Sequence, residues 1–201
     1  MRRFFGCLCL VIALAFLAAC SGNSIEAPDF DFEIVSIQDQ STQGMRRYWY
    51  RVAVSHEATP SEIEHLARYI VELVKADKDF NALQIWFFDF AEFAMPGRSH
   101  HTLGEAIYAP GGAWARASEV VAGDYRTFDF SFTLPEKDWS LRLTPEEAAI
   151  FGYWREIQEV AGFSEPVINS MVANEFEITI EEVENILLRQ LVWAHNRIRG
   201  D

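Results

Sequence analysis

Alternating apolar and polar positions predict two β-strands shortly after residue 29. The stretch "FDFEIVSI" at 30–37 begins as an alternation of phenylalanine and acidic residues, which is typical of a half-buried strand. Every second residue from Tyr48 to Val54 is apolar, within "RRYWYRVAVS". A turn-rich stretch, 40–44, lies between the two runs. The pattern therefore predicts a β-hairpin.

A helix and a buried strand are predicted next. Thr59 has the side chain of a helix cap, Pro60 suits the first helical position, and Glu62 completes a capping box. Apolar residues then recur at helical spacing over 63–74, which predicts one buried face. The almost continuous apolar run "ALQIWFFDF" from Ala82 is typical of a central strand covered on both faces.

Two more strands complete the predicted sheet, at 105–109 and 125–134. In the second, alternate residues from Phe128 to Leu134 are apolar and share one face, and Pro135 ends the strand. The order of two strands, a helix and three strands predicts an α+β fold with mainly hairpin connections. We expect a mainly antiparallel sheet of about five strands with one packed helix.

Helical patterns replace strand patterns after Trp139. "TPEE" at 144–147 repeats the capping pattern, and the helix it begins is expected to end at Gly162. A second, short helix is expected at 166–176, and "TIEE" at 179–182 caps a third. The sequence therefore predicts a three-helix C-terminal unit.

The N-terminus has the pattern of a secretory signal. Two arginines precede an uncharged apolar region, Phe4–Phe16. The apolar stretch from Phe4 to Ala19 is shorter than the roughly 20 residues that a membrane-spanning helix needs. A cleaved signal is therefore favoured over a permanent membrane helix.

The residues that follow, Leu17-Ala18-Ala19-Cys20, resemble the lipobox of bacterial lipoproteins at all four positions. The resemblance implies diacylglycerol on the Cys20 thiol, cleavage between Ala19 and Cys20, and acylation of the new amino group. Two or three acyl chains give a durable membrane anchor. Ser21 implies, by the same resemblance, transfer to the outer membrane in a Gram-negative cell. A conventional cleaved signal with an incidental cysteine and an uncleaved anchor are the alternatives.

The expected organisation is a lipoprotein signal peptide at 1–19, a linker at 20–28, an α+β domain at 29–139 and a helical unit at 140–201. Cleavage would remove the other two cysteines. With Cys20 acylated, no thiol would be left in the folded part for a disulfide or a thiolate metal site. We expect packing alone to hold the core.

The charge balance argues against nucleic acid as a partner. The chain has 17 Lys and Arg against 30 Asp and Glu, a formal net charge of -13, and such a surface repels phosphates. "VANEFEITIEEVENILLR" resembles the turn and second helix of a helix-turn-helix module. Its would-be reading helix, however, carries Glu181, Glu182 and Glu184. We expect a plain helical packing unit.

One predicted strand face carries candidate ligand-binding chemistry. Arg47, Trp49 and Arg51 alternate on the face opposite Tyr48 and Tyr50. Guanidinium and indole groups together suit an anionic or sugar-like ligand, a lipid headgroup or an acidic partner protein. The alternative is structural, with Trp49 packed under a helix and the arginines neutralising nearby carboxylates.

Metal-binding and catalytic patterns are weak. "RSHHTLGE" offers His100, His101 and Glu105 as metal ligands, but glycine and proline around them predict a loop, and adjacent histidines point apart. The acid pairs Asp29/Asp31 and Asp89/Glu92 suit general acid–base work, although a solvated strand face and a strand end are the ordinary interpretation. "YAPGGAW" fails the nucleotide-binding patterns, and we expect no cofactor.

A wider stretch, "GEAIYAPGGAWARA" at 104–117, is similar to small uncharacterised bacterial domains, and this similarity implies no activity. The sequence therefore favours a lipid-anchored binding or protein-interaction domain of the bacterial cell envelope. Its expected partners are the membrane, through the lipid anchor, and an unknown envelope protein or small ligand. An envelope hydrolase using His100, His101 and nearby carboxylates, and an inhibitory or protective partner protein, are the alternatives.

Overall fold

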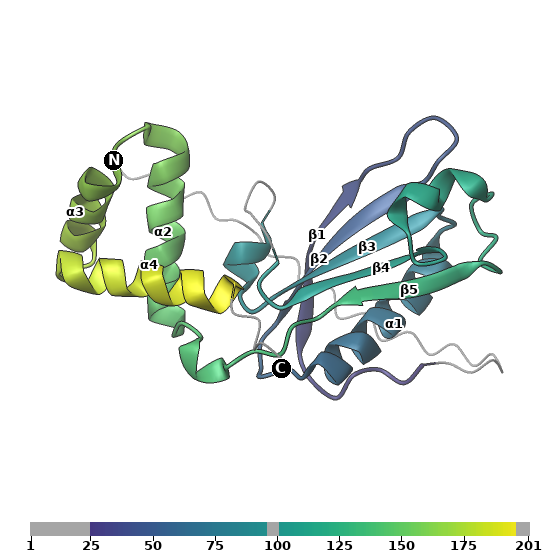
Figure 1. Cartoon of the computed structure of the whole chain (residues 1–201), viewed down its shortest axis with the longest axis horizontal. Helices are drawn as coiled ribbons and strands as arrows, with labels where there is room; N and C mark the ends of the chain where they lie inside the picture. Colours follow the sequence, from purple (N-terminus) through teal and green to yellow (C-terminus); the bar gives the residue numbers. More distant parts are fainter. Residues whose placement is uncertain (1–24, 96–100, 196–201) are drawn as a thin grey trace, which may run out of the picture.

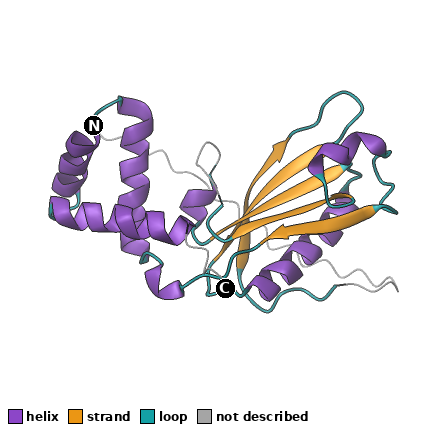
Figure 2. Cartoon of the chain, viewed as in Figure 1, coloured by secondary structure: helices purple, strands orange, loops and turns teal. Residues whose placement is uncertain are grey.

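A computed structural model describes residues 25–95 and 101–195. A five-stranded sheet with one helix on its face forms one part, and three further helices gather beyond one end of the strands (Figures 1 and 2). The α+β class predicted from the sequence is confirmed. The elements are β1 (Phe32–Asp39), β2 (Arg47–Val54), α1 (Pro60–Asp77), β3 (Ala82–Phe88), η1 (Ala91–Ala94), β4 (Gly104–Pro110), η2 (Trp114–Glu119), β5 (Phe128–Thr133), η3 (Trp139–Leu141), α2 (Pro145–Ala161), α3 (Glu165–Glu175) and α4 (Ile180–His195).

The strands lie side by side in the order β1-β2-β3-β4-β5. β1 and β2 form the predicted antiparallel hairpin, and β3, β4 and β5 also pair antiparallel. β2 and β3 are parallel neighbours, because α1 carries the chain back to the end of the sheet at which β2 begins, and β3 starts from there. The sheet is thus mixed but mainly antiparallel.

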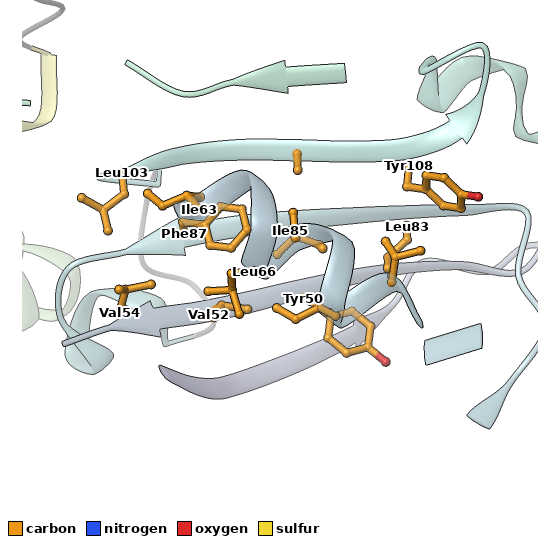
Figure 3. Close-up of a cluster of buried hydrophobic side chains, with 14 of the residues drawn as sticks. Tyr50, Val52, Val54, Ile63, Leu66, Leu83, Ile85, Phe87, Leu103 and Tyr108 are labelled. Carbon is orange, nitrogen blue, oxygen red and sulfur yellow. The ribbon is translucent and has the colours of Figure 1, made fainter. Parts of the chain in front are cut away.

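α1 begins where the capping pattern predicts. The Thr59 hydroxyl accepts the backbone N–H of Glu62 at 3.3 Å, and the Glu62 carboxylate accepts the backbone N–H of Thr59 at 2.7 Å. These contacts satisfy two donors that the helix itself leaves unpaired. On the apolar face of α1, Ile63 and Leu66 are buried against the sheet (Figure 3). Ile70 is buried as well, whereas Leu73, which the helical spacing places on the same face, is 44% exposed.

β5 is shorter than the predicted strand 125–134. Tyr125 lies before the strand, where its hydroxyl accepts the backbone N–H of Phe80 at 3.3 Å and its ring packs on the Phe80 ring. Tyr125 makes this tertiary contact in place of strand pairing, and β5 pairs with β4 only from Phe128 onward. Phe128, Phe130 and Phe132 still share the face that packs toward α1, as the alternation predicted.

The C-terminal unit consists of α2, α3 and α4. Thr144 caps α2 through a full capping box, and Gly162 ends it in the left-handed conformation, φ 60°. The unit shares its core with the sheet: Phe88 and Phe93 pack with the buried faces of the three helices. Conversely, α4 contributes a residue to the core of the sheet: Trp193 belongs to the cluster between α1 and the sheet.

Candidate functional site

The sheet face opposite α1 collects the candidate ligand-binding residues of β2. The registers of the neighbouring strands place Trp49 beside Gln84, Arg51 beside Trp86, and Trp86 beside Glu105. η2 adds a further tryptophan at one end of this face. We call the following set the tryptophan face: Arg47, Trp49, Gln84, Trp86, Glu105 and Trp114.

The three indole rings form a continuous aromatic surface. The Trp49 and Trp86 rings stack with centroids 5.3 Å apart and an interplanar angle of 25°. Trp114 lies 6.1 Å from Trp49, tilted by 43°. The Trp49 indole N–H is buried and finds no acceptor within residues 25–95 and 101–195. The rings pack against one another, and the guanidinium groups of Arg51 and Arg47 lie over Trp86 and Trp114.

The two arginines of the predicted face differ in their surroundings. Arg51 is 5% exposed, donates through Nη1 to the Met95 carbonyl at 2.6 Å, and lies 5.1 Å from the Trp86 ring centroid. Burial lowers the pKa of Arg51. Arg47 is half-buried, lies 5.3 Å from the Trp114 ring centroid, and donates through Nε to the Gln40 carbonyl. Arg47 is therefore the more accessible cation.

Glu105 provides the acidic group of the tryptophan face. Its Oε2 accepts the Gln84 amide at 2.7 Å and the Trp86 indole N–H at 3.2 Å. These two bonds fix the carboxylate and orient the Trp86 ring. The ring of His101 meets Trp86 edge-on at 6.2 Å.

The predicted metal ligands do not form a metal site among the residues that the structure describes. His100 lies outside those residues. Within the described ranges, no group of three His, Cys, Asp or Glu side chains could hold a metal ion. Glu105 instead pairs with neighbouring strand residues.

A second candidate site lies at the junction of the sheet and the C-terminal helices. It is a partly open cavity of about 470 Å³, between the start of β1, the end of β2, η1 and the start of α2. We call it the junction pocket. Its lining consists of Asp31, Phe32, Glu33, Ala53, Val54, Ser55, Asp89, Phe90, Ala91, Arg142, Leu143 and Pro145.

Asp89 is the buried acid of the junction pocket, 2% exposed at the end of β3. Its Oδ1 accepts the Thr102 hydroxyl at 2.6 Å, and its Oδ2 lies 3.8 Å from Arg142 Nε. Burial raises the pKa of Asp89, while the Thr102 hydroxyl, the Arg142 charge and the Trp193 indole act in the opposite direction. Arg142 also donates through Nη2 to the Asp89 carbonyl at 2.6 Å.

The predicted acid pairs divide between this pocket and the surface. Asp31 and Asp89 line the pocket, whereas Asp29 and Glu92 are exposed outside it. Asp89 directly follows β3, as the interpretation of a strand end expects, and it is buried because Thr102 and Arg142 close over it. Sequence reasoning missed Arg142, which stands in an irregular stretch with no periodic signal.

Comparison of the chain with known protein families, curated proteins and solved structures finds no match. In the part of the chain that the structure describes, no helix is long and apolar enough to cross a membrane. The lipobox, with Ala19 and Cys20, lies outside that part.

Proposed function

We propose that this chain is a lipid-anchored binding domain of the bacterial cell envelope, and that its tryptophan face holds a sugar-like ligand bearing negative charge. The observation that carries the ligand proposal is the meeting of Trp49, Trp86 and Trp114 on one sheet face with Arg47 beside them. The anchor proposal is supported by the lipobox sequence at 17–20.

The chemistry of the tryptophan face favours this ligand class. Indole faces pack against the C–H surface of a sugar ring, and planar amide and carboxylate groups bind its hydroxyls. Gln84 and Glu105 lie next to the stacked rings and supply such groups. Arg47 is the accessible cation, and a guanidinium binds carboxylate or phosphate groups.

The anchor is tested by labelling cells with a clickable fatty-acid analogue. The wild type should be labelled and processed to begin at Cys20. Cys20→Ala should be neither labelled nor processed, because the acyl acceptor is missing. Cys9→Ala, which alters a cysteine within the signal, is the matched control and should be labelled like the wild type. Equal labelling of Cys20→Ala and wild type would refute the anchor.

The ligand proposal is tested by tryptophan fluorescence during titration with galacturonic acid oligomers. We expect quenching for these acidic sugars and at least tenfold weaker binding of the neutral galactose oligomers. Trp49→Ala and Arg47→Gln should each weaken the acidic sugar by about tenfold. Arg126→Gln, which changes an arginine with an 87% exposed side chain on another surface, should bind normally.

Far-UV circular dichroism serves to check that each variant is folded. A folded Trp49→Ala protein that binds the acidic oligomers like the wild type would refute the proposed ligand surface. Equal affinity of wild type for acidic and neutral oligomers would refute the role of charge. Neither result bears on the anchor, which is tested separately.

A further inference from the structure

The junction pocket has the size and walls of a small-molecule site. Its volume of about 470 Å³ falls in the range of roughly 300–1,000 Å³ that is usual for ligand pockets. It is partly open to solvent, and residues from four separate segments line it. The apolar part of its wall consists of Phe32, Ala53, Val54, Phe90, Ala91, Leu143 and Pro145.

The charges of the pocket do not cancel. Among the described residues that line the pocket, Arg142 is the only cation. Its charge is offset by Asp89, whose carbonyl it binds at 2.6 Å and whose carboxylate it approaches at 3.8 Å. Two more carboxylates, those of Asp31 and Glu33, stand exposed at the pocket and form no ion pair with any residue of the described ranges. The pocket therefore has an excess of negative charge.

Asp89 gives a second, independent indication of this charge pattern. Its side chain is fully buried in the pocket wall. Its Oδ2 forms no hydrogen bond within the described residues, and the Arg142 charge and the Trp193 indole act on the carboxylate from nearby. The Arg142 guanidinium is held over the Phe90 ring, 4.4 Å from its centroid, and so cannot swing out to bind an anion without leaving this contact. A cleft with carboxylates and low-dielectric walls concentrates cations.

We propose that the junction pocket binds an organic cation with an apolar body, such as a cyclic or branched alkylamine. The ammonium group pairs with Asp31 and Glu33, and the hydrocarbon part packs on Phe90 and Leu143. The same chemistry is offered by a free amine and by a lysine side chain of another protein. This site is separate from the tryptophan face and does not depend on the function proposed for it.

The test uses cyclohexylamine as the probe and cyclohexanol as its neutral isostere, with the protein purified from its full-length gene in a non-ionic detergent. Isothermal titration calorimetry, corrected for detergent alone, measures both affinities. We expect the amine to bind at least tenfold more tightly than the alcohol. A lysine-containing tripeptide tests whether the ammonium group can come from the lysine side chain of a protein. If the tripeptide binds as tightly as cyclohexylamine, the pocket accepts a lysine side chain as well as a free amine.

Two kinds of variant separate charge from shape. Asp31→Asn combined with Glu33→Gln should weaken amine binding at least tenfold, whereas Glu57→Gln, an exposed glutamate outside the pocket, should not change it. Ala91→Phe narrows the cavity without altering charge and should also abolish binding. Since residues 31 and 33 are exposed, the double variant is expected to keep the wild-type unfolding midpoint.

Three results would overturn the proposal. Equal affinity for amine and alcohol would remove the role of charge. Wild-type amine affinity in the folded double variant would remove Asp31 and Glu33 from the site. Unchanged binding in a folded Ala91→Phe protein would mean that the amine is attracted to the acidic surface in general and does not enter the pocket.

Discussion

Replacing Trp193 with alanine is expected to loosen the C-terminal helices from the sheet. The Trp193 side chain of α4 is fully buried in the cluster between α1 and the sheet. Its ring meets that of Trp139 edge-on, with centroids 5.1 Å apart. Lys137 lies against the same ring and donates to the Trp193 carbonyl at 2.6 Å, near the C-terminal end of α4. One side chain thus joins two parts of the fold.

The magnitude follows from the buried area. A fully buried tryptophan removes about 200 Å² from water, and at about 25 cal/mol per Å² this burial is worth ~5 kcal/mol. Alanine retains a small part of that area, and the loss of the edge-on contact with Trp139 adds up to ~1 kcal/mol. The two corrections nearly cancel, so we expect a loss of about 5 kcal/mol in the free energy of unfolding, at the upper end of the range seen for Trp→Ala changes in cores.

Urea denaturation followed by circular dichroism measures this loss. Leu188→Ala is the matched control, since Leu188 lies on the same helix but is 58% exposed, and its change should stay below about 1 kcal/mol. The hydrogen bond from Lys137 goes to a backbone carbonyl and survives both substitutions, whereas the contact of Lys137 with the Trp193 ring is lost only in Trp193→Ala. If Trp193→Ala falls within about 1 kcal/mol of Leu188→Ala, the inferred docking of α4 on the sheet is wrong.

Substitutions at three further residues test local features. Thr59→Ala should lower the free energy of unfolding, measured in urea, by about 1 kcal/mol, because the Thr59 hydroxyl caps α1. Thr59→Ser keeps a hydroxyl and should have the stability of the wild type. Equal losses of stability in the two variants would contradict the role of the hydroxyl. Gly104→Ala should lower the free energy of unfolding by about 3 kcal/mol in the same assay, since Gly104 has φ +127° and an added Cβ would clash with the Thr133 carbonyl oxygen. An unchanged midpoint would refute this strain. Burial raises the pKa of Asp89 above 3.8, so the folded state binds the proton of this carboxyl more tightly than the unfolded state does. The contribution of Asp89 to the free energy of unfolding therefore falls as the pH rises from about 4 through the pKa of the folded state. The stability of wild type relative to Asp89→Asn should therefore fall over that range, and parallel pH profiles of the urea midpoints would contradict the assignment.

The features predicted correctly from the sequence are those that neighbouring residues determine. Thr59, Thr144 and Thr179 each begin a helix, because a capping box needs only a hydroxyl, a glutamate three positions later and the backbone between them. Alternation likewise placed Arg47, Trp49 and Arg51 on one face of β2, since strand geometry fixes the side of each residue. No tertiary knowledge enters either inference.

The features that were missed depend on contacts between distant segments. Trp86 joins Trp49 only because α1 returns the chain to make β3 a parallel neighbour of β2. Trp114 reaches the same face from η2, after the β4 strand. Asp89 and Arg142 are 53 positions apart, and neither stands in a pattern that points to the other. Such pairings follow from the sheet order and helix docking, which local periodicity does not specify.

The junction pocket and the docking of the C-terminal helices are energetically linked. Arg142 binds the Asp89 carbonyl, Arg189 of α4 donates to the Arg142 carbonyl at 2.9 Å, and Arg189 also pairs with Glu147 of α2. This chain of contacts holds one wall of the pocket, Arg142 to Pro145, against the sheet ends that form the other. Substitutions that loosen α4, Trp193→Ala among them, should therefore weaken the binding of an amine in the pocket, although they lie outside its lining. By linkage, an amine that binds only the docked form should raise the unfolding midpoint of the wild type more than that of the Asp31→Asn/Glu33→Gln variant.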